Sequence, residues 1–158
     1  MEDITRIPPH SVESEQSILG SILLDKEAII TVSESINSED FYKEAHKIIY
    51  ESMLKLSNKS EPIDLITLTE ELKKQGHLDD VGGISYITSL STIVPTTSNV
   101  DSYIRIVEEK ATLRSLIKAA NDIISYGYAE TEEVKREIIF ENTLTFESYT
   151  FDANSIID

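Results

Sequence analysis

The stretch SNVDSYIRIVEEKATLRSLIKAANDIISYG, residues 98–127, carries the longest regular hydrophobic pattern in the chain. Its apolar residues recur at steps of three and four positions, which is the repeat of one face of an α-helix. Ser98 or Asn99 can cap the start of this helix. A helix of about 27 residues would be near 40 Å long at about 1.5 Å per residue. Because that is long for a chain of 158 residues, we expect part of it to project and to pack against something else.

Shorter helical patterns fill most of the chain before this stretch. Pro8 and Pro9 favour an extended lead-in at 1–10, and Ser11 can cap the helix that follows. Hydrophobic residues at helical spacing predict a succession of further helices, each separated from the next by capping or turn residues. These are expected over 26–36, from Phe41 to between Ser57 and Ser60, and from a cap at Asp64 or Thr67 to a stop at Gly76. A last short helix is expected to carry Ile84 to Leu90 and to end before Pro95.

The part of the chain after Gly127 is less regular. The stretch ETEEVKREIIF at 130–140 can start a helix. The stretch TLTFESYTF at 143–151 has a β-like composition in which Thr and aromatic residues alternate imperfectly. The sequence therefore predicts an all-α fold with an irregular tail or weak strand at its C-terminal end.

Composition and charge exclude several classes of protein. The net charge is −15, so the chain should bind DNA poorly, because a phosphate backbone attracts clusters of Lys and Arg. No apolar run approaches 18 residues, so we expect no membrane span. The N-terminal residues are acidic and polar, unlike a secretory signal. The absence of cysteine excludes disulfides and thiolate metal sites and fits a cytoplasmic location.

Motifs that would mark an active site are missing from the sequence. None of the five glycines lies in a Walker A or dinucleotide-binding pattern, and no HExxH pattern is present. We interpret His46, a lone histidine in a helical stretch, as structural. Asp79 and Asp80 could bind a divalent cation together with Asp64 or Glu61, but a solvated turn is the simpler interpretation. We therefore predict no catalytic residue, cofactor site or metal site in this chain.

The long helix of residues 98–127 is apolar over a wide arc, which leaves two interpretations open. Its apolar residues can be ordinary core, or one side can be buried in the domain while another side pairs with a second copy. Helices that pack in this way build symmetric dimers. The candidates for self-association are Tyr103, Ile104, Val107, Leu113, Leu116, Ile117, Ala120 and Ile124.

The order of these landmarks resembles the N-terminal domain of bacterial replicative helicases of the DnaB type. The stretches that carry the resemblance cover most of residues 6–128, and their order and spacing make it specific. They are PPHSVESEQSILGSILLD at 8–25, DFYKEAHKIIY at 40–50, IDLITLTEELKKQG at 63–76, VGGISYITSL at 81–90 and PTTSNVDSYIRIVEEKATLRSLI at 95–117.

The resemblance implies a domain organisation. It implies an extended arm at 1–10, a compact helical bundle at 11–97, a projecting helical hairpin at 98–147, and at 148–158 the start of a linker to a RecA-like motor domain that this sequence does not contain. In the family, the hairpins pair, and the domains form a trimer-of-dimers collar on a hexameric ring. The stretch REIIFENTLTF departs from the family's second hairpin helix, which usually carries an AExxIF-type pattern.

The resemblance also implies binding partners, and it implies that the helicase activity lies in a separate domain. The primase C-terminal domain docks on the collar, and some helicase loaders act through the collar or the neighbouring linker. ATP, Mg²⁺ and 5′→3′ unwinding belong to the separate motor domain, so we expect no enzymatic activity in this chain.

Three hypotheses follow. The first is a collar domain that mediates self-association and recruits primase or loader during DNA replication. The second is a free-standing phage or plasmid homologue that modulates a host helicase through the same surfaces. The third is an unrelated acidic helical enzyme or DNA mimic, which a metal- or ATP-dependent activity would favour.

Overall fold

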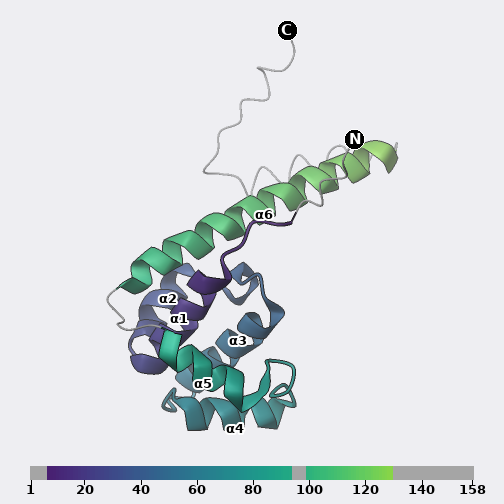
Figure 1. The fold of residues 1–158 in the computed structure, drawn as a ribbon. Coiled ribbons are helices and arrows are strands. Elements are labelled where there is room, and N and C mark those ends of the chain that lie inside the picture. Colours follow the sequence, from purple (N-terminus) through teal and green to yellow (C-terminus); the bar gives the residue numbers. More distant parts are fainter. Residues whose placement is uncertain (1–6, 94–98, 130–158) are drawn as a thin grey trace. The chain divides into compact units, whose positions relative to one another are not determined.

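The computed structural model describes residues 7–93 and 99–129. Every regular element within these ranges is helical, which confirms the all-α prediction. The second hairpin helix and the irregular tail expected after residue 129 lie outside the described residues. The elements are α1 (Val12–Leu24), α2 (Ala28–Ser35), the 3₁₀ helix η1 (Ser38–Asp40), α3 (Glu44–Asn58), α4 (Leu65–Gln75), α5 (Gly83–Ile93) and α6 (Val100–Ala129) (Figure 1).

Local capping chemistry sets several helix ends, as the sequence predicts. The Ser11 hydroxyl accepts a hydrogen bond from the Ser14 backbone N–H at 3.3 Å and so caps α1. Of the two candidate caps for α4, Asp64 is the one used: its carboxylate accepts from the backbone N–H of Thr67 at 2.9 Å. The hydrogen bonds from the backbone N–H groups of Thr67 and Ile66 lower the pKa of the Asp64 carboxyl. Gly76 ends α4 at φ +77, a conformation that costs glycine little.

The start of α3 differs from the prediction. Phe41 is extended, at φ −74 and ψ 133, and α3 begins only at Glu44. The preceding residues instead form η1, which a capping box between Asn37 and Asp40 closes. The hydrophobic spacing of Phe41 fits a helix, but its backbone is set by these local polar contacts and by Glu15, described below.

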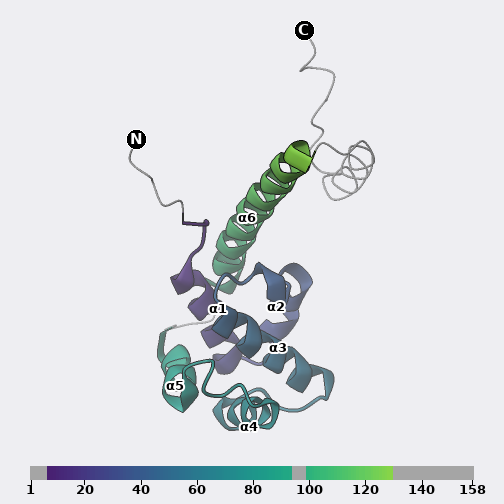
Figure 2. The same cartoon turned by 90° about the vertical axis from the view of Figure 1, so that its right-hand side faces the viewer.

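The chain divides into two compact units, Met1–Arg114 and Ser115–Asp158. Within the first unit, α1 packs against α2, α3 and α5, and α4 packs against α3 and α5 (Figures 1 and 2). We call the helices of this unit the bundle. The described part of the second unit is the remainder of α6, residues 115–129. The expected boundaries at residues 10, 97 and 147 stay predictions.

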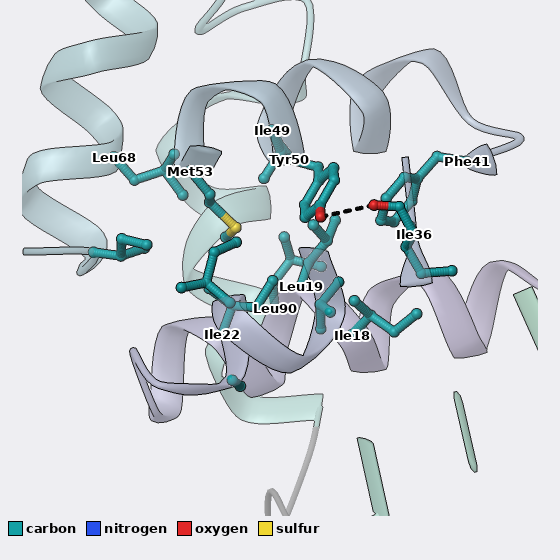
Figure 3. Close-up of a cluster of buried hydrophobic side chains, with 14 of the residues drawn as sticks. Ile18, Leu19, Ile22, Ile36, Phe41, Ile49, Tyr50, Met53, Leu68 and Leu90 are labelled. Carbon is teal, nitrogen blue, oxygen red and sulfur yellow. Dashed lines mark hydrogen bonds between the residues drawn. The ribbon is translucent and has the colours of Figure 1, made fainter. Parts of the chain in front are cut away.

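The bundle has one hydrophobic core. Figure 3 shows its centre, where Ile18 and Ile22 of α1 lie near Tyr50 and Met53 of α3, all fully buried. The Tyr50 hydroxyl donates a hydrogen bond to the Ile36 carbonyl at 3.0 Å. Burial raises the pKa of Tyr50 to about 12, with the Asp40 carboxylate adding to the effect. The core thus holds its most polar large side chain neutral and hydrogen-bonded.

Candidate interaction surface

The eight predicted self-association residues of α6 do not share one environment. Ile104 and Val107 are 4% and 2% exposed and belong to the core of the bundle, and Tyr103 is partly buried against it. These three residues offer little or no surface to a partner, and their apolar character is explained by the fold of the bundle itself. We therefore remove them from the candidate surface.

The other five residues are exposed. Leu113, in the first unit, is 37% exposed. The remaining four lie in the second unit, where Ile123, which the candidate set omitted, is exposed as well. We call the exposed aliphatic residues of the second unit the apolar stripe: Leu116, Ile117, Ala120, Ile123 and Ile124, of which the four large side chains are 45–56% exposed.

The apolar stripe covers one side of the helix. Its residues follow at steps of one, three and four, and at about 100° per residue they fall within an arc of about 120°. The charged residues of the same segment, Lys118 and Asp122, fall outside that arc. A helix segment with this division is amphipathic, so its apolar side is expected to meet an apolar surface. Clustered exposed apolar residues are typical of contact sites.

The polar groups buried in the bundle form a network that ties three helices together. Glu15 of α1 is 1% exposed, and its carboxylate accepts hydrogen bonds from the backbone N–H groups of Tyr42 at 2.7 Å and Lys43 at 3.3 Å. His46 Nδ1 lies 2.6 Å from Glu15 Oε2, and its Nε2 lies 2.6 Å from the hydroxyl of Tyr86 in α5. The network therefore holds the start of α3 between α1 and α5.

This network supports the structural interpretation of His46. Both ring nitrogens are bonded within the protein, and the side chain is fully buried. Because a carboxylate can only accept, Nδ1 carries the proton that faces Glu15. Gln16 also donates to the Tyr86 hydroxyl, at 3.0 Å. In the described ranges, every buried side-chain polar atom has a partner.

The acidic turn does not assemble a metal site. Asp80 pairs with His77 at 2.9 Å, while Asp64 is engaged in capping α4. Within residues 7–93 and 99–129, no group of three or more acidic or histidine side chains could hold a metal ion. The glycines of the turn have a conformational role instead: Gly82 has φ +94, and a Cβ there would lie 3.0 Å from the Cβ of Tyr86. The same described residues contain no helix suited to crossing a membrane.

Comparison with known proteins identifies one family. The family model described as "DnaB-like helicase N terminal domain" matches residues 7–109. The replicative DNA helicase DnaB of Geobacillus stearothermophilus is 46% identical over 129 residues, which are 82% of this chain and 28% of that protein. The chain thus spans less than a third of the length of this curated relative.

Solved structures show the same fold. The N-terminal domain of DnaB helicase from Mycobacterium tuberculosis matches with a TM-score of 0.82 at 38% identity, over 90% of this chain and 100% of that one. The N-terminal domain of DnaB helicase from Helicobacter pylori, described together with its interactions with primase, matches with a TM-score of 0.63 at 22% identity, over 73% of this chain and 90% of that one. By its sequence and its fold, this chain belongs to the family of DnaB-like helicase N-terminal domains.

Proposed function

We propose that this chain is a docking domain of a replicative helicase, which associates with a second copy of itself and recruits primase or a helicase loader. The observation that carries the proposal is the apolar stripe on α6. Its four large aliphatic side chains are exposed, and the charged residues of the same helix segment lie on the other sides of the helix. A surface of this kind is stabilised when a partner removes it from water.

A second copy is the partner that suits the stripe. A stripe of aliphatic residues without charge is self-complementary, so two copies related by a twofold axis can each bury the other's stripe. Such an interface repeats every contact twice. In the proposed assembly, three such dimers form the collar of a hexameric ring.

The test of self-association is the mass of the full chain across a concentration series, by analytical ultracentrifugation. We expect a concentration-dependent dimer. Ile117→Asp should weaken the dimer, because each of the two symmetry-related sites would bury a charge at a cost of about 2 kcal/mol or more. The total of about 4 kcal/mol corresponds to a rise in Kd of about a thousandfold. Ser115→Asp is the matched control, since it adds the same charge to an exposed residue of α6 outside the stripe.

A folded monomer at every concentration would overturn the self-association proposal. A different result would follow if residues 130–158 of the same chain covered the stripe. Ile117→Asp would then lower the midpoint of thermal unfolding without changing the mass, and Ser115→Asp would do neither.

Primase docking is the second part of the proposal. The Helicobacter pylori domain with this fold is described with its interactions with primase, and we extend that partner, in the form of the primase C-terminal domain, to this chain. The direct test is calorimetric titration of that domain into the chain and into the Ile117→Asp variant. Binding to the wild type alone would show that docking needs the dimer. Absence of binding to both would remove primase as the partner and leave the loader.

The motor function is proposed to reside elsewhere in the parent protein. ATP and Mg²⁺ binding and 5′→3′ unwinding are assigned to a RecA-like domain, and this chain should neither hydrolyse ATP nor hold DNA tightly at physiological salt. The net charge of −15 supports weak DNA binding, because counterion release needs basic groups on the protein. Fluorescence anisotropy with labelled DNA tests this, and tight, salt-sensitive binding would contradict it.

A further inference from the structure

Arg114 joins three segments of the bundle that are far apart in sequence. One guanidinium nitrogen donates to the Pro9 carbonyl at 2.8 Å, and another donates to the Asp40 carbonyl at 2.5 Å. The guanidinium carbon also lies 5.7 Å from the centre of the Tyr42 ring, within the range of a cation–π contact. The side chain therefore connects α6 to the N-terminal arm, whose described residues are 7–10, and to the turn before α3.

The arm has a second contact with the same place. The His10 ring stacks on the Tyr42 ring with centroids 4.2 Å apart and planes 11° apart. His10 Nδ1 also lies 2.7 Å from the Pro8 carbonyl, which favours one ring orientation. Residues 7–10 have no regular secondary structure, and among the described residues the contacts with Tyr42 and Arg114 hold them against the bundle.

The chemistry of the contact favours arginine. The guanidinium presents its N–H donors in a rigid planar fork, so one side chain can reach two carbonyls from different segments at once. The partners here are carbonyl groups rather than carboxylates, although the chain has 29 acidic residues. The contact is thus specified by geometry rather than by net charge.

We propose that Arg114 is the positioning residue of a clasp, formed with Pro9, His10, Asp40 and Tyr42, that couples the N-terminal arm to α6 and fixes the last two turns of α6 held by the bundle, residues 108–114. Arg114 is the last residue of the first compact unit. Displacing the arm should therefore loosen residues 108–114 of α6, and loosening those residues should free the arm. The clasp is a property of the bundle alone and does not depend on the proposed self-association.

The test uses NMR on the full chain, with Arg114→Met as the variant. Met removes the fork but keeps a long side chain with good helix propensity. We expect amide hydrogen exchange at residues 108–114 to become about tenfold faster, and the heteronuclear NOE of the His10 amide to fall toward that of a mobile segment. Arg114→Lys should fall between Met and wild type, because an ammonium lacks the planar fork.

Arg105→Met is the matched control, since Arg105 is an exposed arginine of the same helix whose side chain bonds locally, to Ser102. It should leave both readouts unchanged. Tyr42→Leu tests the clasp from the turn before α3: it removes the ring on which His10 stacks and should also accelerate amide hydrogen exchange at residues 108–114.

Two results would overturn the clasp. One is an Arg114→Met variant whose α6 exchange and His10 mobility match those of Arg105→Met. The other is an amide hydrogen exchange in α4 that becomes faster by the same factor as in α6. That would show a general loss of stability rather than the release of two coupled segments.

Discussion

Glu15→Ala should lower the free energy of unfolding by about 3–5 kcal/mol, because it removes the buried acceptor that three donors share. The carboxylate is 1% exposed and accepts from three donors: the backbone N–H groups of Tyr42 and Lys43, and His46 Nδ1. Leaving buried donors unpaired costs about 1–3 kcal/mol each. A domain of this size is stable by only about 5–15 kcal/mol, so the loss would be a large fraction of the total.

The assay is urea unfolding followed by circular dichroism at 222 nm. Glu13→Ala is the matched control, because Glu13 lies in the same first turn of α1 but is exposed, and its loss should cost less than about 1 kcal/mol. Glu15→Gln should fall between the two, since one acceptor oxygen remains. If Glu15→Ala cost no more than Glu13→Ala, the network would not hold the start of α3.

Two further predictions test single hydrogen-bonded groups. Tyr50→Phe should cost about 1 kcal/mol at pH 9 through the lost bond to the Ile36 carbonyl. Burial raises the pKa of Tyr50 from 10.0, its value in the unfolded chain, to about 12 in the folded protein. The neutral phenol therefore stabilises the fold fully below pH 10, and this contribution is lost as the pH rises from 10 to 12. Urea titrations should therefore show wild type losing at most about 2 kcal/mol relative to Tyr50→Phe over that interval; a constant difference would refute the shift. Asp64→Ala should cost about 1 kcal/mol by removing the cap of α4. Since the pKa of Asp64 is lowered in the folded protein, its carboxylate stabilises the fold above the ordinary carboxyl pKa, and this contribution is lost as the pH falls through the lowered value. The difference in unfolding free energy between wild type and Asp64→Ala should therefore shrink in acid. A difference that grew in acid would contradict the prediction.

The helices, and those helix ends that local caps set, are the part of this fold that the sequence predicts well. The hydrophobic repeat of α6 and the caps at Ser11 and Gly76 depend on residues within one or two turns of each other. Local spacing is enough to identify such features because the atoms that bond are near in sequence.

Contacts between polar residues distant in sequence are the part that the sequence does not reveal. The start of α3 depends on Glu15, which lies 27 residues before Tyr42. The Arg114 side chain bonds to Pro9, 105 residues away. Neither pair has a spacing that repeats, so no local pattern indicates it, and a lone Glu or Arg on a helix is equally compatible with a solvated side chain.

The split of the α6 candidates shows why hydrophobic spacing alone identifies a helix but not its partners. Ile104 and Leu113 are nine residues apart, which places them on roughly opposite sides of the helix at about 100° per residue. Ile104 is in the bundle core and Leu113 is exposed. Ile104→Asp would therefore place a charge in the core and report on folding, whatever the oligomeric state. Ile117→Asp places the same charge on an exposed residue, so a change in mass there, without loss of the folded monomer, is the result that can separate an interface from a core.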